Sequence, residues 1–66
     1  MARKNNEGGE GVRIDCEVKH ETARALLVDI DTVGETWFPM STVNQIHKQD
    51  GYIVVDRWIA EKLELI

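Results

Sequence analysis

Asp29 and Asp31 are the side chains whose type and spacing come closest to catalytic chemistry. They lie two positions apart, so on a β-strand both project from one face, where paired carboxylates can serve as general acid and base. No histidine, cysteine or third carboxylate with a fixed partner completes a base or a metal site around them. Paired acids beside a turn are usually solvated, and we therefore expect the chain to be non-enzymatic.

The other candidates for nucleophilic or metal chemistry are Cys16, His20 and His47. One cysteine cannot form an internal disulfide, and with two distant histidines it cannot build a metal site. The sequence implies no cation or helix terminus beside Cys16, which favours a small core residue over a reactive thiol. We therefore expect no cofactor and no metal, and a reducing, cytoplasmic compartment.

Binding chemistry centres on Trp37. Strand periodicity places Trp37 and Leu27 on one face of a sheet, with charged side chains around them. The charged neighbours are Arg13, Asp15, Glu17, Lys19 and Asp29. An apolar centre with a polar rim is typical of an interface, either with another molecule or in a seam between two copies of this chain.

Two classes of partner could use this face. A protein with a basic surface would pack on the apolar centre and pair its cations with the acidic rim; that set is Trp37, Leu27, Asp15, Glu17 and Asp29. A single-stranded nucleic acid would stack bases on Trp37 and place phosphates on cations; that set is Trp37, Arg13, Lys19 and Arg24, with Lys48 beside it. The net charge of −4 favours the basic protein, because acidic domains repel phosphate backbones.

A β-hairpin from Ala23 to Ser41 is predicted to position these side chains. Gly34 lies in the turn Asp31–Glu35, where a type I turn with a bulge needs a positive φ. The expected cross-strand pairs are Ile30 with Thr36 and Val28 with Phe38. Both faces of the hairpin are apolar, so we expect each face to be covered.

The first predicted strand runs from Val12 to Lys19, with apolar residues on one side and charged residues on the other. A turn at His20–Thr22 pairs it with the hairpin and sets Arg13 against Asp29. The apolar pairs of that register are Val12, Ile14 and Cys16 with Ile30, Val28 and Leu26. A two-residue turn would shift the register by one.

The C-terminal part is expected to complete the sheet and to cover one side of it. In chain order the predicted elements are a turn capped by Ser41 that contains Val43 and Ile46, a loop at His47–Gly51, a fourth strand at Tyr52–Val55 and a helix from Arg57 to about Leu65. The Asp56 carboxylate is expected to cap the helix. We place this helix over Val28 and Phe38, with Trp58 as a packing anchor.

The predicted fold class is therefore α+β, a four-stranded antiparallel sheet followed by one C-terminal helix. It forms one domain over residues 12–66, after a polar arm over residues 1–11 that we expect to be disordered. Domains of about 60 residues bury only about 60% of their unfolded surface, so we expect a homodimer. No segment has the features of a signal peptide or approaches the ~18 apolar residues that a membrane span needs.

Four groups of residues resemble one family. They are Glu21-Thr22…Ala25-Leu26-Leu27-Val28…Ile30-Asp31, Trp37-Phe38-Pro39-Met40-Ser41, Ile53-Val54-Val55 and Trp58-Ile59-Ala60-Glu61-Lys62. The pattern is similar to small phage and prophage proteins of the “ET-x-ALL-V-x-ID … W-I-P-K-S … W-L-A-E-K” type. Some of these look like the single-stranded-DNA-binding transcriptional coactivators, whose fold a phage anti-CRISPR protein also uses.

The resemblance implies a dimeric, non-enzymatic phage protein in a bacterial host that binds and inhibits a nucleic-acid-defence complex such as a CRISPR effector. The alternative it implies is a single-stranded nucleic-acid-binding module of phage replication, recombination or transcription. Met40 stands where the family pattern has lysine, so one cation beside Trp37 is lost. This departure weakens the implied nucleic-acid binding.

Overall fold

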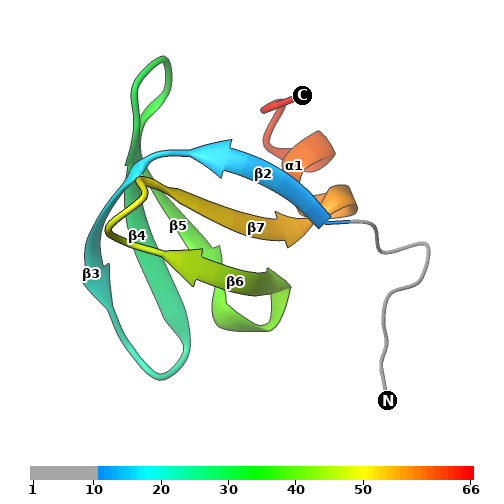
Figure 1. The fold of residues 1–66 in the computed structure, drawn as a ribbon. Coiled ribbons are helices and arrows are strands. Elements are labelled where there is room, and N and C mark those ends of the chain that lie inside the picture. The colour runs from blue at the N-terminus through cyan, green and yellow to red at the C-terminus, as the bar shows by residue number, and fades with distance from the viewer. Residues whose placement is uncertain (1–10) are drawn as a thin grey trace.

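The computed structural model describes residues 11–66, and most of the predicted arm lies outside these residues. The described chain consists of short strands and one C-terminal helix (Figure 1). In order, the elements are β2 (Gly11–Asp15), β3 (Glu17–Glu21), β4 (Ala25–Ile30), β5 (Gly34–Pro39), the 3₁₀ helix η1 (Met40–Thr42), β6 (Val43–His47), β7 (Tyr52–Asp56) and α1 (Arg57–Lys62).

The strands form two antiparallel sheets of three, in the orders β2-β7-β6 and β3-β4-β5. The α+β class and the C-terminal helix are confirmed, whereas the single four-stranded sheet is wrong. Figure 1 shows the two sheets crossing, with α1 beside the edge of the first sheet at which β2 begins and β7 ends. The second sheet, rather than the helix alone, covers the inner side of the central hairpin.

A bend at Cys16 explains the difference. The predicted strand Val12–Lys19 is interrupted there: β2 pairs with β7, setting Ile14 opposite Ile53, and β3 pairs with β4, setting Val18 opposite Val28. The predicted pairing of Val12, Ile14 and Cys16 with β4, and of Arg13 with Asp29, is therefore wrong. Cys16 N donates to the carbonyl of Gly51 at 3.0 Å, which ties the bend to the β6–β7 loop.

The β4–β5 hairpin is confirmed. Gly34 has a φ of 94°, as the predicted turn requires. Ile30 pairs with Gly34 rather than with Thr36, so the predicted register is two residues out. Because side chains alternate with a period of two, an even shift leaves every residue of the hairpin on its predicted face.

The turn between β3 and β4 lies later than predicted. β3 continues to Glu21, and Thr22 organises the turn: its Oγ1 accepts hydrogen bonds from the backbone N–H groups of Arg24 at 3.2 Å and Ala25 at 2.9 Å. Threonine hydroxyls can hydrogen-bond to nearby backbone groups and so stabilise such turns. The predicted turn at His20–Thr22 is thereby corrected.

The segment after Pro39 also differs from the prediction. Val43–His47 is strand β6 rather than part of a capped turn, and the preceding turn is held by Thr42, which is buried and donates from Oγ1 to the Pro39 carbonyl at 2.7 Å. The predicted strand at Tyr52–Val55 is confirmed as β7, which extends by one residue.

The helix begins where predicted but is shorter. The Asp56 carboxylate accepts a hydrogen bond from Asn44 Nδ2 at 3.1 Å and makes no capping bond, so its predicted role is wrong. The helix ends after Lys62 because Glu64 adopts a φ of 60°, and Leu65 N then donates to the Ala60 carbonyl at 2.8 Å. This is the hydrogen-bond pattern of a Schellman C-cap.

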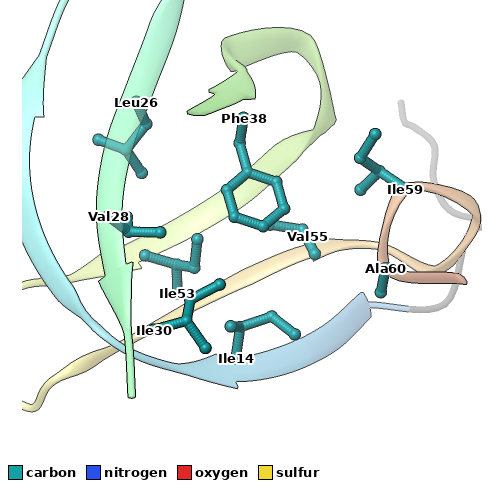
Figure 2. Close-up of a cluster of buried hydrophobic side chains, with 9 residues drawn as sticks. All are labelled: Ile14, Leu26, Val28, Ile30, Phe38, Ile53, Val55, Ile59 and Ala60. Atoms are coloured by element: carbon teal, nitrogen blue, oxygen red, sulfur yellow. The ribbon is translucent and has the colours of Figure 1, made fainter. Parts of the chain in front are cut away.

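The hydrophobic core lies between the two sheets, and α1 closes one end of it (Figure 2). It contains Ile14, Leu26, Val28, Ile30, Phe38, Ile53, Val55, Ile59 and Ala60. Full burial of an aliphatic or phenyl side chain of this size contributes about 1.5–3 kcal/mol. Trp58 is 55% exposed, so it is not the packing anchor we expected. Among the described residues, no helix is long and apolar enough to cross a membrane.

Candidate binding face

The outer side of sheet β3-β4-β5 carries four of the five residues predicted to bind a partner protein, Glu17, Leu27, Asp29 and Trp37. Along β4 and β5 the even-numbered residues turn toward the core, and the odd-numbered residues turn outward. Strand pairing then aligns the outward side chains in rows across the sheet. We call this surface the outer face; its rows are Glu17, Asp29 and Glu35, then His20, Leu27 and Trp37, then Ala25 and Pro39.

The first row is acidic. Glu17 lies opposite Asp29, and Asp29 lies opposite Glu35, so three carboxylates stand side by side on adjacent strands. The Glu17 side chain is 73% exposed. Like charges directly opposite each other destabilise a sheet, so this row is a feature that folding alone does not favour.

The second row is apolar and aromatic. Trp37 lies opposite Leu27, which in turn lies opposite His20. The His20 and Trp37 rings have centroids 6.4 Å apart and an interplanar angle of 86°, an edge-to-face arrangement. Trp37 is nevertheless 51% exposed, which leaves a large indole surface in solvent beside the acidic row.

A shallow hollow of about 290 Å³ adjoins the acidic row at the bend. It is lined by Asp15, Cys16, Glu17, Asp29 and Asp31. Asp29 and Asp31 therefore do lie together, as their spacing predicted, but beside further carboxylates rather than a base. Within residues 11–66 no group of three or more histidines, cysteines and acids has the arrangement of a metal site.

Cys16 is the nucleophile nearest to these carboxylates. Its pKa is raised from the ordinary value of 9.0 because the thiol is partly desolvated and lies beside the Asp15 charge, although a backbone hydrogen bond from Ile53 opposes the shift. A raised pKa reduces the thiolate fraction, and the thiolate is the reactive form. The geometry thus agrees with an inert cysteine.

The cations predicted to contact phosphates are divided between the two sheets and the turns. Arg13 lies on the other sheet, where its Nε donates to Asp15 Oδ1 at 3.0 Å and its guanidinium lies over the Tyr52 ring. Lys19 lies 3.8 Å from the Glu17 carboxylate, and Arg24 lies in the turn between β3 and β4. Lys48 pairs with Glu21 at 3.3 Å.

The structure therefore brings together most of the acidic set and divides the cationic set, with Lys19 on β3 of the same sheet and Arg13 on the other sheet. Trp37, Leu27, Glu17 and Asp29 share the outer face, with Asp15 at its margin. Glu35 and His20 belong to the same rows and were missed by sequence reasoning. Alternation along β5 already placed Glu35 on the face of Trp37, whereas the bulge between Val18 and His20 that turns His20 outward left no sequence signal.

The outer face thus combines exposed indole and aliphatic surface with a neighbouring row of carboxylates. Comparison of the chain with protein-family models, with curated proteins and with solved structures finds no match.

Proposed function

We propose that this protein is a non-enzymatic binding module whose outer face docks on a basic protein surface. Following the family resemblance, we propose further that it is a phage-type accessory protein whose partner is a host nucleic-acid-defence complex, which it inhibits. The observation that carries the binding mode is the alignment of the acidic row, Glu17, Asp29 and Glu35, beside the exposed ring of Trp37.

The face suits such a partner in two ways. Exposed tryptophan is enriched among residues that dominate binding energy, because it buries a large rigid surface. Complementary charge accelerates association and orients the partner, and the described residues supply it through four carboxylates around the hollow at the bend. A protein that presents Lys or Arg beside an apolar pocket fits both rows at once.

The exposed indole also supports the second candidate, a single-stranded nucleic-acid-binding module. Stacking on an aromatic side chain is worth about 1–3 kcal/mol per base. However, phosphates flanking a base on Trp37 would meet Asp29 and Glu35, while Arg13 is engaged on the other sheet. The first candidate is therefore the better fit to the geometry.

A fluorescence titration separates the two candidates. In a Trp58→Phe background, Trp37 is the sole indole and reports directly on the outer face. The probes are a Lys/Arg-rich peptide and an oligothymidylate, each titrated at low and at moderate salt. We expect the peptide to change the Trp37 emission, with binding that weakens as salt rises.

The matched control carries Asp29→Asn and Glu35→Gln, which remove charge but keep shape. It should bind the peptide less tightly and should leave the oligothymidylate unbound or bind it slightly better. Tight binding of oligothymidylate that changes the Trp37 emission, with no response to the peptide, would refute the basic-protein proposal and support the second candidate.

A further inference from the structure

The edge of β5 that faces away from β4 carries main-chain N–H groups that could pair with a further strand. Met40 N donates to the Arg24 carbonyl at 2.7 Å, which fixes the phase of the hydrogen bonds between β4 and β5. In that phase the even-numbered residues of β5 exchange main-chain hydrogen bonds with β4. The N–H groups of Glu35 and Trp37 therefore point away from β4, toward a side where no other described strand pairs with β5.

Pro39 limits the length of this edge. Its backbone nitrogen also faces away from β4 but carries no hydrogen, and its carbonyl already accepts the Thr42 hydroxyl. Proline occurs at sheet edges for this reason, because no ladder bond is lost there. The part of the edge that can both donate and accept is the stretch from Glu35 to Trp37.

We infer that this edge pairs in antiparallel fashion with β5 of a second copy of the chain, with Thr36 on the two-fold axis. Glu35 N then donates to the Trp37 carbonyl of the second copy, and Trp37 N donates to the Glu35 carbonyl of the second copy. Both free donors in each chain are satisfied.

Dimers in the two neighbouring registers would be less stable. With Trp37 on the axis, Glu35 lies opposite Pro39, which returns no N–H, so one hydrogen bond is lost on each side of the axis. With Glu35 on the axis, two carboxylates lie directly opposite each other, which is destabilising. With Thr36 on the axis, each Glu35 faces an indole, and two threonines form a favourable cross-strand pair.

This dimer makes one continuous sheet of the two β3-β4-β5 sheets, so the two outer faces become neighbours. Formation of this dimer does not require the proposed partner. Each copy carries a net charge of −4, so salt should strengthen the self-association by screening repulsion. Binding to a basic protein has the opposite salt dependence, and the two associations can be told apart.

Sedimentation equilibrium over a concentration series, at low and at high salt, tests the dimer. Wild-type protein should shift from monomer to dimer as concentration rises, and more so at high salt. Glu35→Pro removes an edge N–H that the β4 ladder does not use and should remain monomeric, whereas Glu35→Gln keeps that N–H and should dimerise at least as well as wild type. A wild-type monomer throughout the series, or equal dimerisation of Glu35→Pro, would overturn the inference.

A cross-linking variant tests the register and does not depend on the proline variant folding. In a Cys16→Ala background, Thr36→Cys places two thiols across the axis, where a non-hydrogen-bonded pair has Cα atoms about 4.5 Å apart, within the disulfide range. Thr32→Cys, in the exposed turn, is the control. Mild oxidation should convert Thr36→Cys to a disulfide dimer at least about tenfold faster than Thr32→Cys. Equal rates would contradict the register.

Discussion

The guanidinium of Arg13 lies 4.1 Å from the centroid of the Tyr52 ring, and His47 stacks on the same ring at 4.4 Å with an interplanar angle of 21°. Because β7 runs between β2 and β6, the two groups approach Tyr52 from opposite sides. Arg13 also pairs with Asp15. The cation that sequence reasoning placed beside Trp37 is thus part of a separate stack on the other sheet.

Arg13 should therefore contribute to stability rather than to binding. Replacing it with Ala removes a cation–π contact at an exposed site, and we expect the free energy of unfolding to fall by about 0.5–1 kcal/mol. Arg24→Ala, which removes the same charge from a turn, should change it by less than about 0.5 kcal/mol. Urea denaturation measures both, and a loss of peptide binding by Arg13→Ala at unchanged stability would contradict this assignment.

Asp29 should contribute to binding rather than to stability. It is flanked by Glu17 and Glu35, so Asp29→Asn relieves repulsion on both sides, and we expect the free energy of unfolding to rise by a few tenths of a kcal/mol, within the range of about 0.2–1 kcal/mol for cross-strand pairs. The same change should weaken binding of a Lys/Arg-rich peptide by up to about fivefold.

The matched control for Asp29 is Asp50→Asn. Asp50 lies in the β6–β7 loop, so this variant has the same net charge but leaves the acidic row intact. It should neither stabilise the fold nor weaken the peptide complex. Equal effects of the two variants, measured by denaturation and by titration, would show that net charge rather than the acidic row determines both properties.

The sequence predicted the hairpin and its faces because both depend on local chemistry. Gly34 marks the turn, and alternation along β4 and β5 assigns inner and outer residues even when the register is two residues out. It could not predict the bend at Cys16, since residues 12–19 alternate identically before and after the bend. The bend is set by distant pairing, of Ile14 with Ile53 and of Val18 with Val28.

The same bend decides how much of the binding face was predictable. Residues of β4 and β5 were assigned correctly, so Leu27, Asp29 and Trp37 share a surface. Arg13 was assigned to that surface by continuing the alternation of β3 into β2, across a change of sheet. Asp15, which lies next to the bend, remains at the edge of the surface.

Replacing Gly34 should destabilise the fold through the backbone conformation alone, without a steric clash. Its φ of 94° is strained for residues with a side chain, while an added Cβ would meet no atom within 4 Å. We expect Gly34→Ala to lower the free energy of unfolding by about 1–2 kcal/mol. Asn tolerates positive φ better, so Gly34→Asn should cost less. Thermal unfolding in which the two variants lose equal stability would contradict this explanation.

Cys16 should react slowly with thiol reagents. Partial burial and the Asp15 charge raise its pKa above 9.0, so near pH 8 the folded protein holds less thiolate than an unfolded chain does. Alkylation by iodoacetamide should therefore be slower in the native protein than in the urea-unfolded protein. Asp15→Asn should accelerate the native reaction, because it removes one of the two causes of the shift. An unchanged rate would show that burial alone controls the thiol.

The raised pKa of Cys16 also has a consequence for stability. The folded state holds the thiol proton more tightly than the unfolded state, so the contribution is complete below the unfolded pKa and is lost as pH rises through the folded pKa. We expect wild-type stability to decline above about pH 9, with a smaller decline in Cys16→Ala. Parallel pH profiles of the two proteins would contradict this linkage.

The two tryptophans allow the most direct test of the binding face. Trp37 lies on the outer face and Trp58 on α1, and both indoles are exposed. Their Nε1–H signals in a ¹⁵N-labelled sample therefore report on two separate surfaces during one titration with a Lys/Arg-rich peptide. We predict that the Trp37 signal and the backbone amides of Asp29 and Glu35 shift together while the Trp58 signal stays in place. Shifts confined to Trp58, or an outer face that does not respond, would contradict the proposed function.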